Sequence, residues 1–224
     1  MMIGKTRTNI REEIDTQYEI LLQMIADIAD HYQDEAYRFK EDVYKIAEDN
    51  SDGDFNIKSS ILSNYDVPLE RRFSLTYEAR KILFCSIFSY FESMLYGLIA
   101  YFKIPRKKTN QLEQLIDKIA KEYEERYSEP LIFVGDKNRI CDFYRPLRNK
   151  YMHGHIGNPS DKVKLRLYIE KEGSINSLSG YYEIRDNKFL RDSLNIINTF
   201  LIGIEEAYCK KEIENHWNNT YYKE

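Results

Sequence analysis

The sequence has few cysteines, glycines and prolines. Its three cysteines, Cys85, Cys141 and Cys209, lie far apart and form no C-x-x-C pair. A disulfide framework and a cysteine-based zinc site are therefore not expected, and a reducing compartment fits this cysteine content. With only 9 glycines and 5 prolines among 224 residues, the chain has few helix breakers, which favours long helices.

Positive charge is not in excess either. The 33 lysines and arginines stand against 37 aspartates and glutamates, which gives a net charge of −4. This balance excludes a uniformly basic nucleic-acid-binding protein, but it leaves room for a local basic site. The four histidines form no H-E-x-x-H motif and no Cys/His cluster. Neither a metal site nor a cofactor is therefore expected.

Signals for export or membrane insertion are weak. Residues 1–10 lack the apolar segment of a signal peptide. The stretch from Ile82 to Phe102 is long enough to span a membrane, but Glu92 and three serines interrupt it. A carboxylate in the middle of a span is costly, so this stretch is expected to be a buried core helix. We expect a cytoplasmic protein that does not insert into a membrane.

Most of the chain has the hydrophobic pattern of amphipathic helices. Apolar residues recur every three or four positions, which is the spacing of one helix face. The predicted helices begin with one long or two abutting segments from Arg11 to Asn50. A short helical turn is expected within residues 55–68, followed by a central helix that Pro68 opens and that ends at Phe102. Two further helices are expected, from Thr109 to Tyr127 and from Asp136 to His153. Pro146 must kink this last helix or start a new one, and Gly154 is the natural residue to end it.

The pattern changes after this helix. Val163, Leu165, Leu167 and Ile169 alternate with polar residues, which indicates a strand. Residues 181–184 are its expected partner, with residues 173–180 as the turn, and a final helix is expected over residues 189–214. The predicted fold class is mainly α: an antiparallel helical bundle forming one domain, residues 1–224, with a small β-hairpin at about 162–185 before the last helix.

One short run has the composition of a chemical site. Residues 148–154 read Arg-Asn-Lys-Tyr-Met-His-Gly. An arginine fork matches phosphate oxygens, and an imidazole can accept or donate a proton near neutral pH. Asn149 and His153 are four residues apart, so they share a helix face. We expect Arg148, Asn149 and His153 to point outward, away from Leu147 and Tyr151.

This run resembles the HEPN superfamily (higher eukaryotes and prokaryotes nucleotide-binding domains). Many members carry an arginine, then Asn, Asp or His, and a histidine after four to six intervening residues. Arg148 and His153 fit this pattern with four intervening residues, and Arg148 and His155 fit with six. The resemblance also covers a helical organisation over about residues 70–155, with Glu92 placed on the central helix as acidic residues are in many members.

The resemblance implies a metal-independent endoribonuclease, active as a homodimer and acting in microbial stress or antiphage defence as a toxin. Arg148 would bind the phosphate, His153 would act as general base or acid, and Asn149 would orient them. Two motifs facing each other across a two-fold axis would supply two imidazoles. RNA is then the expected substrate, and an antitoxin or other partner protein is possible. However, His155 stands where some toxins carry a tyrosine that a partner enzyme modifies.

Two plainer interpretations of the same residues stay open. In these interpretations, Arg148 serves as the ion-pair partner of an acidic residue, and His153 favours a helix C-terminus because of its charge. Glu92 is better explained as the partner of an arginine than as a catalytic acid. In that case the chain would be a non-catalytic module that binds a nucleotide, RNA or a protein. The motif segment, Asp136 to His155, carries five lysines and arginines against two aspartates, so a phosphate-binding patch is expected there.

Overall fold

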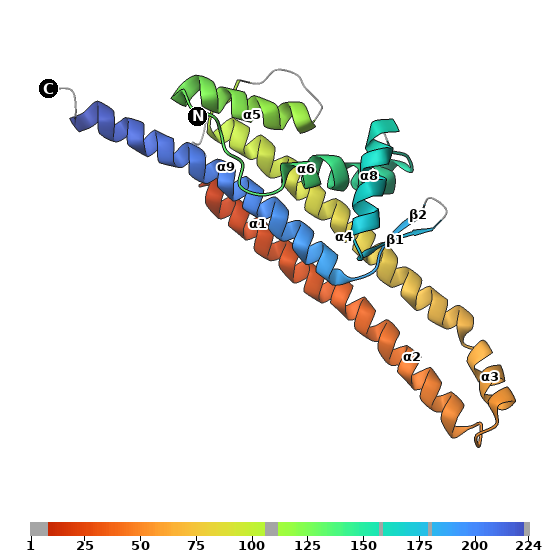
Figure 1. Cartoon of the computed structure of the whole chain (residues 1–224). Coiled ribbons are helices and arrows are strands. Elements are labelled where there is room, and N and C mark those ends of the chain that lie inside the picture. Colours follow the sequence, from red (N-terminus) through yellow and green to blue (C-terminus); the bar gives the residue numbers. More distant parts are fainter. Residues whose placement is uncertain (1–8, 106–111, 157–158, 179–180, 222–224) are drawn as a thin grey trace, which may run out of the picture.

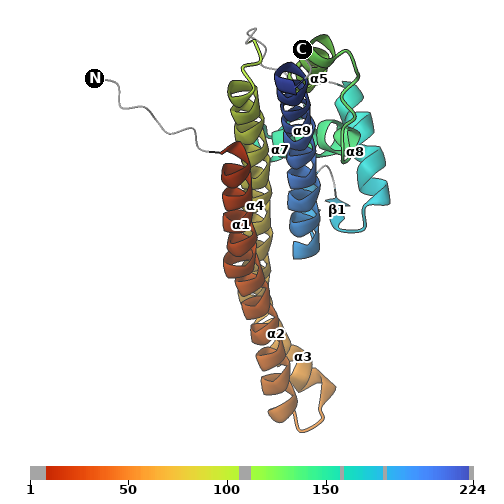
Figure 2. The ribbon, with the colours of Figure 1, turned by 90° about the vertical axis from the view of Figure 1, so that its left-hand side faces the viewer.

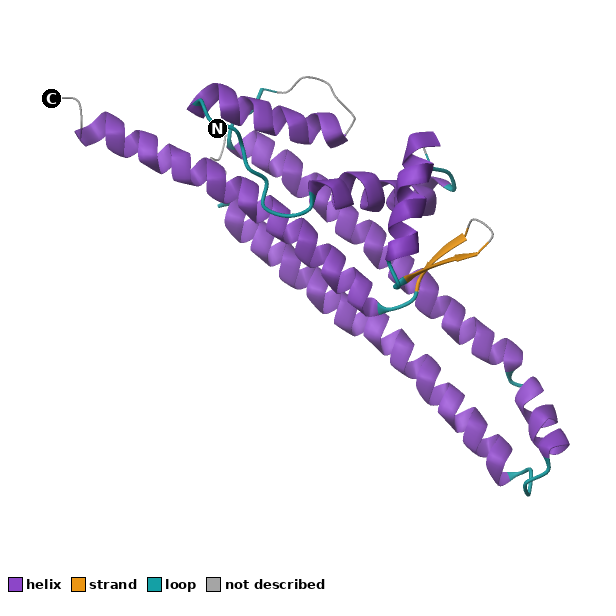
Figure 3. Cartoon of the chain, in the orientation of Figure 1, coloured by secondary structure: helices purple, strands orange, loops and turns teal. Residues whose placement is uncertain are grey.

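A computed structural model describes residues 9–105, 112–156, 159–178 and 181–221. It is mainly helical, as predicted, with one small antiparallel hairpin before the last helix (Figures 1 and 3). The elements are α1 (Ile10–Met24), η1 (Ile25–Asp30), α2 (His31–Asp49), α3 (Phe55–Ser63), α4 (Asp66–Tyr101), α5 (Leu112–Tyr127), α6 (Lys137–Arg139), η2 (Ile140–Tyr144), α7 (Arg145–His153), α8 (Pro159–Lys171), β1 (Ile175–Leu178), β2 (Tyr181–Ile184) and α9 (Asn187–Tyr221).

Three long helical rods form the centre of the molecule, and the third of them is α9 (Figures 1 and 2). The first is the continuous run of α1, η1 and α2, where a π-helical turn joins two α-helices. Its first half runs antiparallel to α9, because Arg11 near its start pairs with Glu205 while Asp30, at the end of η1, contacts Arg191. The second rod, α4, runs parallel to α9, since Phe91 packs on Phe200 and Phe102 packs on Tyr208.

The second half of α4 is the core helix of the molecule. Its side chains are buried on most sides from Ala79 to Ile99. By length and composition α4 also qualifies as a membrane span, but 56% of its most apolar stretch is buried inside the protein. The first turns of α4, together with α2 and α3, extend beyond the other elements as a helical arm (Figures 1 and 2). The arm is held by smaller aromatic contacts, such as Tyr37 on Phe73.

The remaining elements cover one side of α4 and α9. The segment from α6 through η2 to α7 is the predicted helix around Pro146, and the proline lies in the first turn of α7 directly after the π-helical turn. Because proline has no backbone N–H to donate, a change of helix type at this point accommodates it. Gly154 ends α7 in the left-handed conformation, with φ of 72°, as predicted.

The prediction of a strand at residues 163–169 is wrong. These residues belong to α8, in which Leu165 and Ile169 are buried while Val163 and Leu167 are exposed. In an alternating pattern, every second apolar residue also lies four positions from the next one, and residues four positions apart share a helix face. The first strand is β1 instead, within the predicted turn, and Ile175 pairs with Ile184 of the predicted second strand. The predicted start of the third helix at Thr109 lies outside the described residues.

Candidate functional site

The motif lies on α7, which packs directly against α4. Leu147 is fully buried and anchors the helix, and the aromatic ring of Tyr151 packs edge-on against Phe84 of α4. The helix therefore presents one side to the core. His153 lies on an exposed side of the helix, whereas Arg148 and Asn149 are only partly exposed.

Arg148 is held on α4 rather than turned fully outward. One terminal nitrogen donates to Oε2 of Glu92 at 3.2 Å, and the other donates to the side-chain oxygen of Asn149 at 3.1 Å. The guanidinium also lies over the ring of Phe88, 5.7 Å from its centre. Only 21% of the Arg148 side chain is exposed. The expectation that this residue faces outward is therefore wrong, because its long apolar stem packs on α4.

The arrangement fixes the plane of the guanidinium. Each terminal nitrogen carries two N–H groups, and each uses one for the contacts described. Nε is buried and has no hydrogen-bond partner among the described residues. Glu92 itself is 36% exposed, so the ion pair lies at the edge of the solvent. A planar cation held this way can meet an anion with its unused N–H groups.

The two histidines end the motif helix. His153 is the last residue of α7, and both His153 and His155 are exposed. Their rings are stacked, with 6.2 Å between centres and 30° between the ring planes. Lys150 closes the helix by donating to the carbonyl oxygen of Gly154 at 3.0 Å. The sharp turn at Gly154 thus brings both candidate histidines of the motif to one place.

The predicted basic patch is largely neutralised by the fold. Lys137 pairs with Asp117, Arg139 with Glu172, and Arg145 with both Glu113 and Asp161. With Arg148 on Glu92, four of the five cations of the segment have a carboxylate partner from another element. Lys150 donates to a backbone carbonyl instead. Any phosphate site here therefore depends on a few placed groups rather than on a broad positive surface.

Burial changes the chemistry of two groups beside Arg148. It raises the pKa of the Cys85 thiol, and the positive charge of Arg148 opposes this shift only in part. Burial also raises the pKa of Tyr151, whose hydroxyl has no hydrogen-bond partner among the described residues. Both groups therefore stay neutral near pH 7, and neither is activated as a nucleophile.

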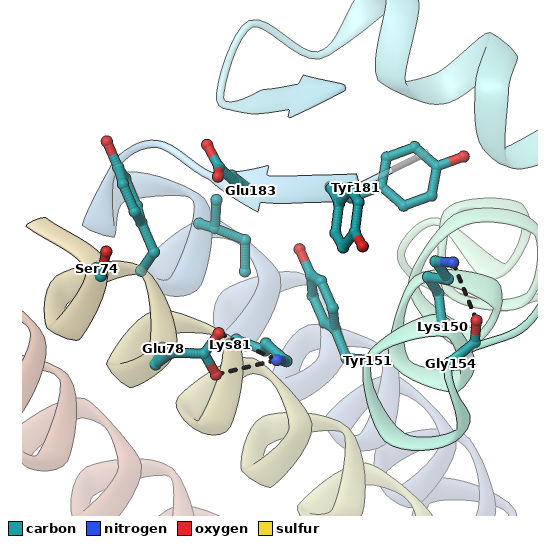
Figure 4. A pocket seen from close by; sticks show the side chains of 11 residues that line it. Ser74, Glu78, Lys81, Lys150, Tyr151, Gly154, Tyr181 and Glu183 are labelled. Atoms are coloured by element: carbon teal, nitrogen blue, oxygen red, sulfur yellow. Dashed lines mark hydrogen bonds and ion pairs between the residues drawn. The ribbon is translucent and has the colours of Figure 1, made fainter. Parts of the chain in front are cut away.

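A cavity borders the motif helix on its other side (Figure 4). It measures about 650 Å³ and lies between the arm-side half of α4, the end of α7 and strand β2. Its lining residues are Ser74, Tyr77, Glu78, Lys81, Lys150, Tyr151, Gly154, Tyr181, Tyr182, Glu183 and Ile184. No pattern in the sequence indicated this cavity. The available signal was the pair Tyr181-Tyr182 in a four-residue strand, but nothing in the sequence places that strand beside α7.

Comparison of the chain with protein-family models, with curated proteins and with solved structures gives no match. Within the described residues, no group of three or more His, Cys, Asp or Glu side chains is placed to hold a metal ion.

Proposed function

We propose that the protein is a HEPN-like endoribonuclease that cleaves RNA through attack by the substrate's own 2′-hydroxyl, without a metal ion. The observation that carries this proposal is the placement of Arg148. Glu92 and Asn149 hold its guanidinium at 3.2 and 3.1 Å on the helix that ends at the exposed His153. A fixed cation and an exposed imidazole, five residues apart on α7, are the minimum set for phosphoryl transfer of this kind.

The reaction would divide its proton transfers between two histidines. One imidazole takes the proton of the 2′-hydroxyl while O2′ forms a bond to phosphorus. The bond from phosphorus to O5′ breaks, and a second imidazole gives its proton to O5′. The products are a 2′,3′-cyclic phosphate and a 5′-hydroxyl. Arg148 would stabilise the charge on the non-bridging oxygens, and Asn149 would keep its guanidinium in place.

The second imidazole would come from a second copy of the chain. His155 follows Gly154 and so lies outside α7, and we assign it no part in the proton transfers. Acid and base must act on opposite sides of the phosphorus, so a two-fold dimer supplies the missing group. Exposed apolar side chains near the motif, Met152 on α7 and Val163 and Leu167 on the adjoining α8, suit such a contact.

One observation favours a different function. Arg148 already has a carboxylate partner in Glu92, and the neighbouring cations are also paired. A purely structural ion pair would look the same. On that basis the alternative is a non-catalytic module of the same fold that binds a nucleotide, RNA or a protein partner.

The two functions are separated by an RNA cleavage assay in EDTA with wild type and His153→Ala. The nuclease proposal expects cleavage by the wild type and none by the variant. Because His153 is exposed, both proteins should unfold at the same temperature. A wild type that binds RNA but leaves it intact would favour the binding module.

A further inference from the structure

We propose that the cavity between α4, α7 and β2 receives an unpaired nucleobase of the RNA, so that the substrate is single-stranded at this position. This inference rests on the proposed function, because it assigns the cavity to the same substrate. Four tyrosines line the cavity: Tyr77 from α4, Tyr151 from α7, and Tyr181 and Tyr182 from β2. Aromatic faces of this kind stack on bases irrespective of their sequence.

The charges of the cavity favour a neutral ring over a phosphate. Two lysines, Lys81 and Lys150, are balanced by two glutamates, Glu78 and Glu183. Lys81 is paired with Glu78 at 2.9 Å, and Lys150 donates to the backbone at Gly154. The lining therefore offers polar groups for the edges of a base without a net positive charge for its backbone.

The exposed tyrosine at the mouth is the expected stacking surface. Tyr181 is 75% exposed, so its ring is accessible to a base that enters the cavity. Figure 4 shows Tyr181 on β2 and Tyr151 on α7 facing the same space. The buried Tyr151 hydroxyl, which has no partner among the described residues, is a second polar group at this wall.

The cavity and the motif are connected through the end of α7 and through α4. Gly154, which lines the cavity, lies between His153 and His155 in the chain. On α4, Glu78, Cys85 and Glu92 are seven residues apart and therefore lie on one stripe of the helix. Lys81 is about 16 Å along the helix axis from Glu92. A base in the cavity thus belongs to a nucleotide a short way along the strand from the phosphate at Arg148.

The test measures binding apart from cleavage. A fluorescein-labelled 2′-O-methyl RNA oligonucleotide, which has no 2′-hydroxyl to react, is titrated with the full chain and followed by anisotropy. The proteins are wild type, Tyr181→Ala, Tyr181→Phe and Tyr44→Ala. Tyr44 is an exposed tyrosine of α2 outside the cavity, so it is the matched control for loss of one surface ring.

Tyr181→Ala is expected to weaken binding at least about fivefold, the lower limit for losing one stacked base. Tyr181→Phe, which keeps the ring, and Tyr44→Ala should bind like the wild type. The same oligonucleotide with abasic positions should bind as weakly to the wild type as the intact one does to Tyr181→Ala.

Three results would overturn the proposal: no binding by the wild type, equal binding by Tyr181→Ala, or equal binding of the abasic strand. Tyr181-dependent binding by a wild type that cleaves no RNA would support the base site and reject the nuclease. Cleavage of RNA with no dependence of binding on Tyr181 would support the nuclease and reject the base site.

Discussion

Arg148 combines a structural contact with the proposed chemistry, and this distinguishes it from His153. Its side chain is mostly buried, pairs with Glu92 and covers the ring of Phe88. His153 is exposed at the end of α7, with His155 as its ring neighbour. Substitutions at the two positions should therefore affect stability differently even if both abolish activity.

Arg148→Ala is expected to abolish RNA cleavage and also to destabilise the fold by about 1 kcal/mol, since it removes a charged hydrogen bond and the packing of the stem. For a chain of this size, that change lowers the unfolding midpoint by roughly 2–4 °C. Arg148→Lys keeps the charge but not the fork, so it should lose most activity with a smaller thermal shift. Scanning calorimetry and cleavage assays on both variants measure this. An unchanged midpoint in Arg148→Ala would contradict the packed geometry.

His153→Ala should abolish cleavage with an unchanged unfolding midpoint, because the ring is exposed. His155→Ala should retain much of the activity, since His155 lies beyond Gly154 and outside α7. The two variants are matched in chemistry and exposure, so a cleavage assay on both identifies the histidine that acts. If His155→Ala is inactive and His153→Ala is active, the roles are exchanged.

At the scale of elements, the turn at Gly154 decides where the histidines lie. The residue has φ of 72°, a conformation that costs a side chain about 1 kcal/mol or more. There is room for a Cβ, since nothing lies within 4 Å of its ideal position. Any effect of Gly154→Ala therefore comes from backbone strain rather than from a clash.

Gly154→Ala is expected to lower the unfolding midpoint by roughly 2–4 °C and to reduce cleavage, because the end of α7 and both histidines shift. Gly154→Asn should be milder, since asparagine tolerates the left-handed region better. Calorimetry with the cleavage assay compares the pair. Equal behaviour of the two variants would mean that the turn does not position the histidines.

The helices were predictable from sequence where apolar residues recur at helix spacing or, as in the core helix, form a long apolar stretch, and less so elsewhere. The long first helix, the core helix, Gly154 as a helix end and the strand at residues 181–184 follow from local pattern. Residues 163–169 do not, because their two apolar pairs lie on opposite faces of α8 and only Leu165 and Ile169 find the core. Tertiary packing decides which of the two pairs is buried, and the local hydrophobic pattern does not determine that choice.

The candidate site was predictable in its residue types but not in its contacts. Helical spacing correctly placed Leu147 toward the core, and burial cost correctly predicted an arginine partner for Glu92. The identity of that partner depends on how α7 crosses α4, and so does the burial of Arg148. The pairing of the local cations with acids from α5, α8 and the end of α4 likewise required the folded chain.

At the scale of the whole molecule, the proposed mechanism requires two copies of the chain. Light scattering should give a mass near twice the 26.8 kDa of one chain. Met152→Glu, at an exposed position on the motif helix, should shift the mass toward one chain and reduce cleavage. Phe55→Glu is the matched control, because Phe55 is also exposed but begins α3, which lies at the far end of the arm (Figure 1). A wild type that is monomeric at micromolar concentration and still active would contradict the divided roles.

In the proposed mechanism the substrate's own 2′-hydroxyl is the nucleophile, so the chemical nature of the product ends is the decisive measurement. An RNA strand is digested in EDTA and the new ends are identified by mass spectrometry, with a DNA strand and a 2′-O-methyl strand of the same sequence alongside. Attack by the 2′-hydroxyl predicts 2′,3′-cyclic phosphate and 5′-hydroxyl ends on the RNA products, with both control strands intact. A 5′-phosphate end, or cleavage of the DNA strand at a comparable rate, would contradict it.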